Sequence, residues 1–380
     1  MFKRNKQPNV VFDFDSPAPK KGGRYLKLRS WVANHKKLSI VIGVVLVLVL
    51  AAGTVLAVNY LMPKEAPTAV QKPAEKPKPK PKPVVYRSPL TGAAVTNEAA
   101  TKQATTAIMI ENSPDARPQS GLKNSGVVFE AIAEGGITRF LALYQEQKPQ
   151  LIGPVRSVRM YYVDWLAAFN ASVAHVGGSA NALAEVRNGN YRDIDQFFNA
   201  GTYWRATDRY APHNVYTSFE KLDALNKAKG YETSSFTGFT RKDSTAAAEK
   251  NATSLNVTIS GPLYNSSYTY NTETNTYDRS QGGAAHIDRE DGAISPRVVI
   301  VMKVSESTVM EDGLRQNINT IGSGTAYIFQ DGTAQEVTWT KTSRGEQITF
   351  ANAAGEDVPL ARGQTWITAV PSDKGGATWL

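Results

Sequence analysis

Glu134-Gly135-Gly136-Ile137-Thr138-Arg139-Phe140 opens the stretch that decides the fold. Two further polar clusters follow it within residues 134–179: Gly153-Pro154-Val155-Arg156-Ser157-Val158-Arg159 and His175-Val176-Gly177-Gly178-Ser179. Apolar runs typical of buried strands lie between the clusters. Such strands would carry the polar residues and glycines at their ends, so the pattern predicts one rim on which the three clusters meet.

Strand and helix patterns alternate around these clusters, which is typical of an α/β or α+β domain. Thr217-Ser218-Phe219-Glu220 has the spacing of a capping box, with Thr217 as the predicted cap of a helix that ends at Gly230. The sequence therefore predicts an α+β (or α/β) domain over residues 84–235. The expected strands are 107–110, 127–132, 140–144 and 171–176, and the expected helices are 161–170, 180–187 and the one ending at Gly230.

Strands and turns dominate the remainder of the chain. Residues 236–253 are rich in Ser, Thr and Lys and are expected to be a linker or loop. Asp331-Gly332 between two strand patterns is a hairpin signal. A mostly β domain is predicted over 254–372, followed by a tail over 373–380. Its expected strands are 255–259, 268–270, 276–279, 298–304, 327–329, 337–339, 347–350 and 365–370.

Residues 38–61 carry the strongest single signal in the chain. They contain no charge, and their only polar side chains are those of Ser39, Thr54 and Asn59. About 20 apolar residues in a helix cross a hydrocarbon core of about 30 Å. A cleaved signal peptide is the alternative, but its apolar region is normally about 7–15 residues long and begins nearer the N-terminus. The sequence predicts an uncleaved, single-pass transmembrane helix.

The charges beside this helix predict its orientation. Arg29, Lys36 and Lys37 precede it, whereas Lys64 follows it beside Glu65. By the positive-inside rule, residues 1–37 form a cytoplasmic tail, expected to be disordered. The Pro/Lys-rich residues 62–83 are predicted to be an extended linker. We therefore expect a cell-membrane protein that has the lipid bilayer as a partner and the bulk of the chain outside the cytoplasm.

The net charge of +9 does not indicate a nucleic-acid-binding protein. Residues 1–83 hold 16 Lys/Arg and 4 Asp/Glu, whereas residues 84–380 hold 27 and 30. The predicted globular part is therefore slightly acidic, and no net attraction to phosphate backbones is expected. The absence of cysteine excludes disulfides, thiolate metal sites, a catalytic cysteine and a lipid-modified N-terminal cysteine.

Glycines and arginines in the three clusters favour an anion site. Gly177-Gly178-Ser179 between a strand and a helix allows a ligand to approach free helix amides, although the alternative is a tight turn with a capping serine. Arg156 and Arg159 lie near the start of a predicted helix, where their charge opposes the helix dipole. They could bind phosphate or carboxylate, or form salt bridges to Glu130, Glu134 or Asp164.

Candidates for proton transfer are His213, Glu134 and Asp195, of which His213 lies in the loop Ala211-Pro212-His213-Asn214. No ligand spacing indicates a metal, and no dinucleotide fingerprint or P-loop indicates a cofactor. The predicted ligand-binding residues are Glu111, Asn112, Arg117, Arg139, Arg156, Arg159, His175, Gly177, Gly178, Ser179 and Asn214.

The chain resembles the YerB-like family of exported, membrane-attached bacterial proteins, which carry a two-part domain of unknown function. The resemblance covers about residues 88–372 and rests on the three clusters and on further motifs. Those are Pro89-Leu90-Thr91-Gly92, residues 109–122, residues 211–218, Ile321-Gly322-Ser323-Gly324, Thr338-Trp339 and Gly363-Gln364-Thr365-Trp366. Family members are typically lipoproteins, and this chain departs from that pattern because it has no cysteine to lipidate.

Together these features predict an anchored cell-envelope protein that binds an anionic ligand through a Gly/Arg-rich rim. The expected partners are a cell-wall polymer or peptidoglycan fragment, and other envelope proteins. One alternative is an envelope hydrolase or phosphotransferase that uses His213 or carboxylates together with Arg139, Arg156 and Arg159. Another is a protein-interaction scaffold for the wall machinery.

Overall fold

The computed structural model describes residues 35–61, 84–309 and 314–380. The predicted linker 62–83 and nearly all of the predicted tail 1–37 therefore lie outside the described residues. The chain divides into two compact units, Met1–Pro81 and Lys82–Leu380, and each is described by itself.

The described part of the first unit is helix α2 (Lys36–Leu61), which begins two residues before the predicted span. Among the described residues, it is the one helix long and apolar enough to cross a membrane. The Thr54 hydroxyl donates to the carbonyls of Leu50 (3.0 Å) and Ala51 (2.8 Å), so this polar group is satisfied within the helix. The helix prediction is confirmed, and its composition suits a membrane.

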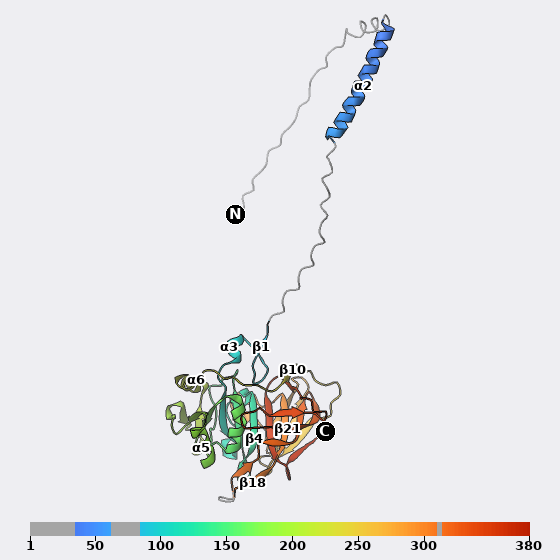
Figure 1. Ribbon diagram of the computed structural model, residues 1–380. Helices are drawn as coiled ribbons and strands as arrows, with labels where there is room; N and C mark the ends of the chain where they lie inside the picture. Colours follow the sequence, from blue (N-terminus) through green and yellow to red (C-terminus); the bar gives the residue numbers. More distant parts are fainter. Residues whose placement is uncertain (1–34, 62–83, 310–313) are drawn as a thin grey trace, which may run out of the picture. The chain divides into compact units, whose positions relative to one another are not determined.

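A ten-stranded sheet forms the core of the second unit (Figure 1). Its strands β3, β4 and β5 are buried almost throughout. Strands covered on both faces are nearly continuous apolar runs, which explains why the sequence pattern located them. In order across the sheet, the strands are β22 (Thr349–Ala351), β21 (Thr333–Lys341), β20 (Gly322–Gln330), β17 (Val298–Val304), β24 (Thr365–Pro371), β4 (Val127–Glu134), β5 (Ile137–Tyr144), β3 (Thr106–Glu111), β6 (Ser172–His175) and β7 (Arg192–Asp195).

Strand β24 joins the α/β part of this sheet to its β-rich part. It runs parallel to β17 on one side and parallel to β4 on the other. Ile367 of β24 lies between Ile300 of β17 and Phe129 of β4. Residues 236–253 were expected to separate two domains. Strands from both sides of this segment nevertheless belong to one continuous sheet.

Helices cover both faces of the α/β part. Helices α4 (Met160–Leu166) and α5 (Ala180–Asn188) share a hydrophobic core with Met109 and Leu141. Helix α6 (Phe219–Ala228) shares a second core with Ile108 and Phe140. Because successive side chains of a strand point to opposite faces, neighbouring residues in β3 and β5 serve different cores.

The prediction of a tail over 373–380 is wrong. Strand β25 (Gly376–Trp379) pairs antiparallel with β11 (Ser254–Thr258) in a second, five-stranded sheet. The Trp379 ring packs on Phe329, with ring centroids 5.3 Å apart, so the core between the two sheets holds this end of the chain. The strand order is β14 (Ala284–Ala285), β13 (Thr276–Gln281), β12 (Ser266–Asn271), β11 and β25.

Two turn predictions are confirmed, and one helix cap is wrong. Asp331 and Gly332 both have positive φ angles, of 59° and 80°, and connect β20 to β21. Gly230, at φ 73°, follows the end of α6. The cap of α6 is Ser218, whose hydroxyl accepts from the Lys221 amide at 3.3 Å. Thr217 instead belongs to a strand, and its hydroxyl donates to the Thr202 carbonyl.

Short elements complete the second unit. They are the strand pairs β1 (Tyr86–Arg87) with β2 (Ala94–Val95), β8 (Tyr203–Arg205) with β9 (Val215–Thr217), β10 (Arg241–Lys242) with β23 (Leu360–Ala361), β15 (Ile287–Asp288) with β16 (Gly292–Ala293) and β18 (Glu306–Thr308) with β19 (Gln316–Ile318), the helix α3 (Glu98–Thr101), and the 3₁₀ turns Pro114–Ala116, Leu122–Asn124, Ala167–Phe169 and Ala200–Thr202.

Candidate functional site

Glu134, at the end of β4, lies between two arginines. Its Oε1 is 2.5 Å from Arg139 Nη2, and its Oε2 is 2.5 Å from Arg159 Nη2. Burial raises the pKa of Glu134, but the charges and hydrogen bonds of the two arginines outweigh burial, so its pKa lies below the usual 4.5. Arg159 thus forms one of the salt bridges that the sequence left open as alternatives to ligand binding. Two cations share one carboxylate, and one positive charge remains unbalanced within this trio.

A cavity of ≈ 470 Å³ opens beside the trio, between the starts of α4 and α5 and the hairpin of β18 and β19. Two of the predicted ligand-binding residues, Arg159 and Ser179, line it. The rest of the lining is mostly hydroxyl and amide groups, with a second guanidinium from Arg315. The lining residues are Arg159, Met160, Tyr161, Ser179, Ala180, Asn181, Ser307, Thr308, Val309, Arg315, Gln316 and Asn317.

The first turn of α5 presents unpaired amides to this cavity. Ser179 is the N-cap residue, but its hydroxyl donates to Asn181 Oδ1 at 2.6 Å and makes no capping bond. Asn181 Oδ1 also accepts from the Ala182 amide. Among the described residues, the amides of Ala180 and Asn181 have no acceptor. Free N–H groups at a helix start favour a negative ligand.

Gly177 and Gly178 serve chain packing. Gly177 has a φ of +60°, and a Cβ at Gly178 would lie 2.7 Å from Val158 Cγ1. The backbone of Val158 donates to Gly177 O and accepts from the Ser179 amide. The glycines therefore let the second cluster of the sequence lie against the third, which corresponds to the tight-turn alternative.

A second carboxylate, Glu111 at the end of β3, holds two other predicted residues. Its Oε1 is 2.9 Å from His213 Nδ1 and 3.3 Å from Arg156 Nε, and it accepts from the Ser113 hydroxyl at 3.0 Å. Glu111 is buried, whereas the side chains of Arg156 and His213 are 24 % and 23 % exposed. The buried carboxylate thus orients two donors that reach the surface.

This arrangement is not a Ser-His-acid triad. Both Ser113 Oγ (3.2 Å) and Glu111 Oε1 lie at the same imidazole nitrogen, Nδ1 of His213. A triad places the nucleophile and the acid at opposite ring nitrogens. His213 Nε2 is instead 3.9 Å from Asp115 Oδ2, on a side chain that is 80 % exposed.

His175 and Asp195 form a third, fully buried group. His175 Nδ1 lies 2.8 Å from Gly177 O, and its Nε2 lies 2.8 Å from Asp193 Oδ1. Asp195 accepts from the amides of Gly177 and Phe197 and pairs with Arg187 at 3.0 Å. Both residues hold the loop after β6. The backbone of this loop lies against the arginine cluster, since the Val176 amide donates to the Arg156 carbonyl, but the side chains of His175 and Asp195 are fully buried.

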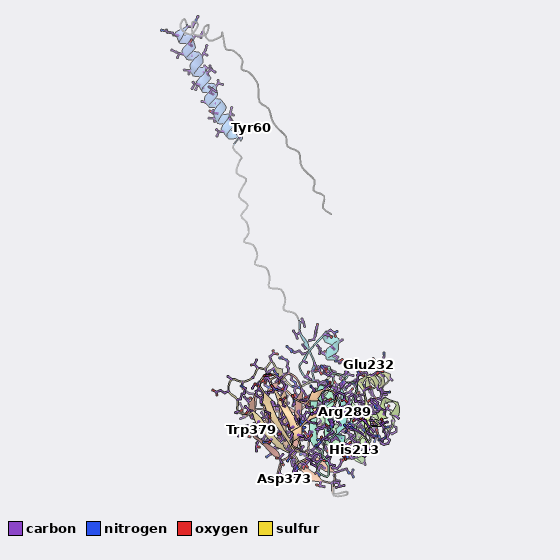
Figure 2. The ribbon with its side chains drawn as sticks, turned by 180° about the vertical axis from the view of Figure 1, so that it is seen from behind. Tyr60, His213, Glu232, Arg289, Asp373 and Trp379 are labelled. Carbon is purple, nitrogen blue, oxygen red and sulfur yellow. The ribbon has the colours of Figure 1, made fainter. Side chains whose placement is uncertain are left out.

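The remaining predicted residues, Asn112, Arg117 and Asn214, are held mainly by backbone and amide groups. Arg117 donates to Asn112 Oδ1 and to the Leu263 carbonyl, which belongs to the β-rich part. Asn214 donates to Ala206 O and accepts from Arg205. His213, of the α/β part, and Trp379, of the β-rich part, are labelled in Figure 2. The predicted site thus divides into separate groups, and of its residues Arg159, from the Glu134 trio, and Ser179 line the cavity.

Comparison with known proteins identifies the family. The N-terminal and C-terminal domains of the protein of unknown function DUF3048 match residues 90–232 and 255–367. The chain belongs to the DUF3048 family. The resemblance expected from the sequence motifs is therefore confirmed.

One curated protein and one crystal structure are similar to this chain over most of its length. "Putative lipoprotein YerB" of Bacillus subtilis (strain 168) is 33% identical over 294 residues, which cover 75% of this chain and 86% of that protein. The crystal structure of the YerB protein from Bacillus subtilis is 30% identical, with a TM-score of 0.69, and the match covers 77% of this chain and 99% of that one. The name of this relative, a putative lipoprotein, and the apolar helix α2 are both consistent with membrane association.

A buried ion pair joins the two DUF3048 domains. Arg279 Nη2 lies 2.9 Å from Glu130 Oε2, and both side chains are fully buried. The Trp366 indole also donates to Glu130 Oε2, and its ring lies 4.5 Å from the Arg279 guanidinium carbon. The sequence carried one signal for this contact, since Glu130 is the only charge in the apolar run from Val127 to Ala133.

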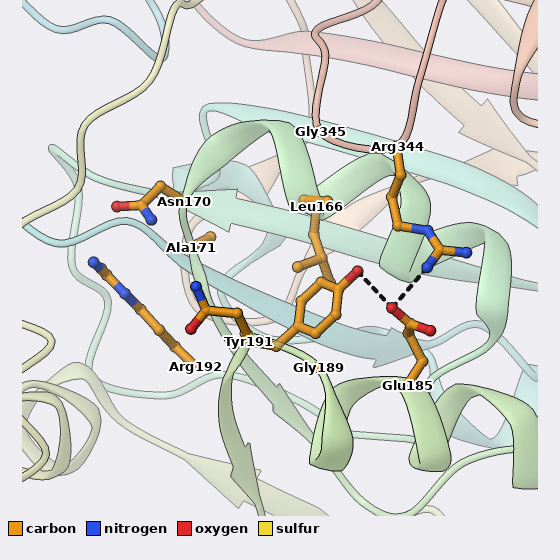
Figure 3. A pocket seen from close by; sticks show the side chains of 11 residues that line it. Leu166, Asn170, Ala171, Glu185, Gly189, Tyr191, Arg192, Arg344 and Gly345 are labelled. Atoms are coloured by element: carbon orange, nitrogen blue, oxygen red, sulfur yellow. Dashed lines mark hydrogen bonds and ion pairs between the residues drawn. The ribbon is translucent and has the colours of Figure 1, made fainter.

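Another cavity of this protein, of ≈ 300 Å³, lies between α5 and the loop that carries Arg344 (Figure 3). Two of its three charged groups are already paired, since Glu185 Oε1 accepts from Tyr191 and lies 2.6 Å from Arg344 Nη1, whereas Arg192 donates to the Thr233 carbonyl. Arg344 also contacts Asp164 at 2.7 Å. This cavity contains none of the residues predicted for the site, and its charges largely compensate one another.

Proposed function

We propose that this DUF3048 protein is anchored in the cell membrane by α2 and binds an anionic envelope ligand in the cavity beside Glu134. The lipoprotein name of its relative and the composition of α2 support an envelope location. The charges before α2 favour export of the globular part. A peptidoglycan fragment or a wall polymer carries the phosphate or carboxylate groups that such a cavity would take.

One observation carries the proposal: Arg159 and the unpaired amides that begin α5 line the same cavity. Glu134 neutralises only one of the two arginines that it contacts. Charged donors aimed at one space are typical of phosphate and carboxylate sites. The adjacent hydroxyl and amide groups could bind the neutral part of the same ligand.

The lining of the cavity suits ligand binding better than it suits catalysis. No histidine or carboxylate is among the described residues that line it. An envelope hydrolase or phosphotransferase needs such a group within hydrogen-bond reach of the reacting atoms. The low pKa of Glu134, next to the cavity, also makes it a poor general acid.

Phosphate binding to the full-length chain in zwitterionic nanodiscs tests the site. We expect Arg159→Ala to weaken binding of inorganic phosphate about tenfold, because a hydrogen bond to a charged group contributes about 1.5–3 kcal/mol. Arg192→Ala, which removes an arginine from the other cavity, is the matched control. Phosphorus NMR titration at constant ionic strength measures both affinities, and equal losses would contradict the proposal.

The backbone amide can be tested without disturbing the ion pairs. Ala180 is the first residue of α5, where proline is well tolerated, and Ser179 already has the extended backbone (φ −67°, ψ 152°) that proline requires before it. Ala180→Pro deletes one N–H and should weaken phosphate binding, whereas Ala180→Gly keeps the amide and should not. Equal affinities in these two variants would exclude the helix start from the site.

The location has its own test. A periplasm- or surface-active reporter fused to the C-terminus should be active in cells, and a cytoplasm-active reporter should be inactive. The opposite pattern would reverse the proposed topology and leave the cavity without access to envelope ligands.

A further inference from the structure

Glu111 and the two side chains that it orients, Arg156 and His213, form the Glu111 group. This group lies at the same end of the sheet as the Glu134 trio. Glu111 and Arg139 are direct register partners in the adjacent strands β3 and β5. The segment that carries Arg156 and Arg159 crosses these strand ends, since the Arg156 amide donates to Met109 O and the Val158 amide donates to Gly177 O. Three residues of extended chain span at most about 10 Å. The two arginines therefore belong to neighbouring sites.

Arg156 keeps most of its hydrogen-bonding capacity. Only its Nε lies near a carboxylate, at 3.3 Å from Glu111 Oε1. Within residues 84–309 and 314–380, its two terminal nitrogens contact no acceptor. A guanidinium that is oriented by a buried carboxylate and remains partly exposed is pre-organised for an anion.

His213 adds a second oriented donor or acceptor. The Glu111 carboxylate can only accept, so Nδ1 of His213 donates to it. In the imidazolium form of the ring, Nε2 also carries a proton and can donate to an anion. The charged groups around the ring are Glu111, Arg156 and Asp115, together with Arg209, which donates to the Asp115 carbonyl. Of the two carboxylates beside the ring, Glu111 lies at Nδ1 and Asp115 lies 3.9 Å from Nε2, on a side chain that is 80 % exposed and can turn into solvent.

We propose that Arg156 and His213 form a second anion subsite beside the cavity, so that the ligand carries at least two separated anionic groups. This inference rests on the proposed function, because it treats the cavity as the first subsite. The shared chemistry is a chain of phosphates or carboxylates, as in an anionic polymer. A molecule that spans two subsites gains affinity through the high effective concentration of its second group.

A series of linear phosphates tests the inference on the full-length chain in zwitterionic nanodiscs. We expect affinity to rise at least about tenfold from orthophosphate to a polyphosphate long enough to span both subsites. Arg156→Ala and His213→Gln should remove most of this gain and leave orthophosphate binding at the cavity unchanged. Arg192→Ala should leave both the gain and orthophosphate binding unchanged. Poly-L-glutamate in a parallel titration distinguishes a carboxylate polymer from a phosphate polymer.

Asp115→Asn provides a variant that should fold, since the side chain is exposed. It should increase polyphosphate affinity and leave orthophosphate affinity unchanged. A gain that persists in Arg156→Ala and His213→Gln, or polyphosphate that binds no better than orthophosphate, would overturn the second subsite while the cavity proposal stands. Failure of phosphates of every length and of poly-L-glutamate to bind would overturn both proposals.

Discussion

Glu130 and Glu134 lie four residues apart on the same strand, and each pairs with arginine, but their surroundings differ. Glu130 is fully buried and contacts Arg279 of the β-rich part. Glu134 is 26 % exposed and contacts two arginines beside a cavity. The first pair is balanced and closed to solvent, whereas the second group holds one unbalanced positive charge beside the cavity. Depth in the sheet, and not residue type, separates a structural carboxylate from one in a candidate site.

Removing Arg279 should have the largest effect. Arg279→Leu leaves a buried carboxylate without its partner, which costs about 3–5 kcal/mol. Urea unfolding of the full-length chain measures the loss. Arg289 (labelled in Figure 2) provides the matched control, because its pair with Asp208 is exposed. Arg289→Leu should cost less than about 1 kcal/mol. Equal losses would remove the distinction between the buried and exposed pairs.

The buried surroundings of Arg279 also predict that stability depends on pH, through the neighbouring His286. Burial, and then the positive charges of Arg279 and Arg117, lowers the pKa of His286 well below its usual 6.5. Below about pH 6.5 the unfolded chain binds a proton that the folded chain does not. The free energy of unfolding therefore decreases as the pH is lowered, by at most about 1.4 kcal/mol per pH unit. His286→Gln should flatten the stability profile between about pH 6.5 and 5. An unchanged slope would show that the ring takes up a proton in the folded state.

Neutralising Glu134 should lower stability by less than removing Arg279 does, and it should raise phosphate affinity. Glu134→Gln removes the anionic partner of Arg139, whose side chain is only 2 % exposed, so it should cost more than the about 1 kcal/mol of an exposed pair. It should cost less than the about 3–5 kcal/mol of a fully buried pair, because Glu134 itself is 26 % exposed. It also removes the carboxylate that competes for Arg159, so phosphate affinity should rise about threefold, since 0.6 kcal/mol is about a factor of three. Thermal unfolding and phosphate titration measure the two changes, and a fall in phosphate affinity would contradict the proposed site.

Glu134→Gln also allows a second test of how stability depends on pH. The pH range of the expected effect is set by the titration of the Glu134 carboxylate. Because the pKa of Glu134 is lowered on folding, its contribution to stability is present above about pH 4.5 and is lost as pH falls through the folded-state pKa. Glu134→Gln should therefore lose less stability than the unaltered chain below about pH 4.5. Parallel profiles would indicate that the arginines do not stabilise the charged form.

Local patterns in the sequence were enough to predict many elements. Val298–Val304 is a strand with the predicted bounds, because its run of β-branched and apolar residues is buried on both faces. Asp331 and Gly332 form the predicted turn, since their positive φ angles suit these residue types. Helix α2, which is long and apolar enough to cross a membrane, follows from composition alone. The candidate site was predicted only in part, because Arg159 and Ser179 border the cavity while His175 and Asp195 are buried elsewhere.

The sequence by itself determined the family, the helix that can cross a membrane, and most strands and turns, because each depends on residues close together in the chain. Only the tertiary structure decided that β24 lies between β17 and β4, that Trp379 completes a second sheet, and which arginine meets which carboxylate. Strand partners and ion pairs join residues far apart in the sequence, and their energies depend on distance and burial, which local patterns do not contain.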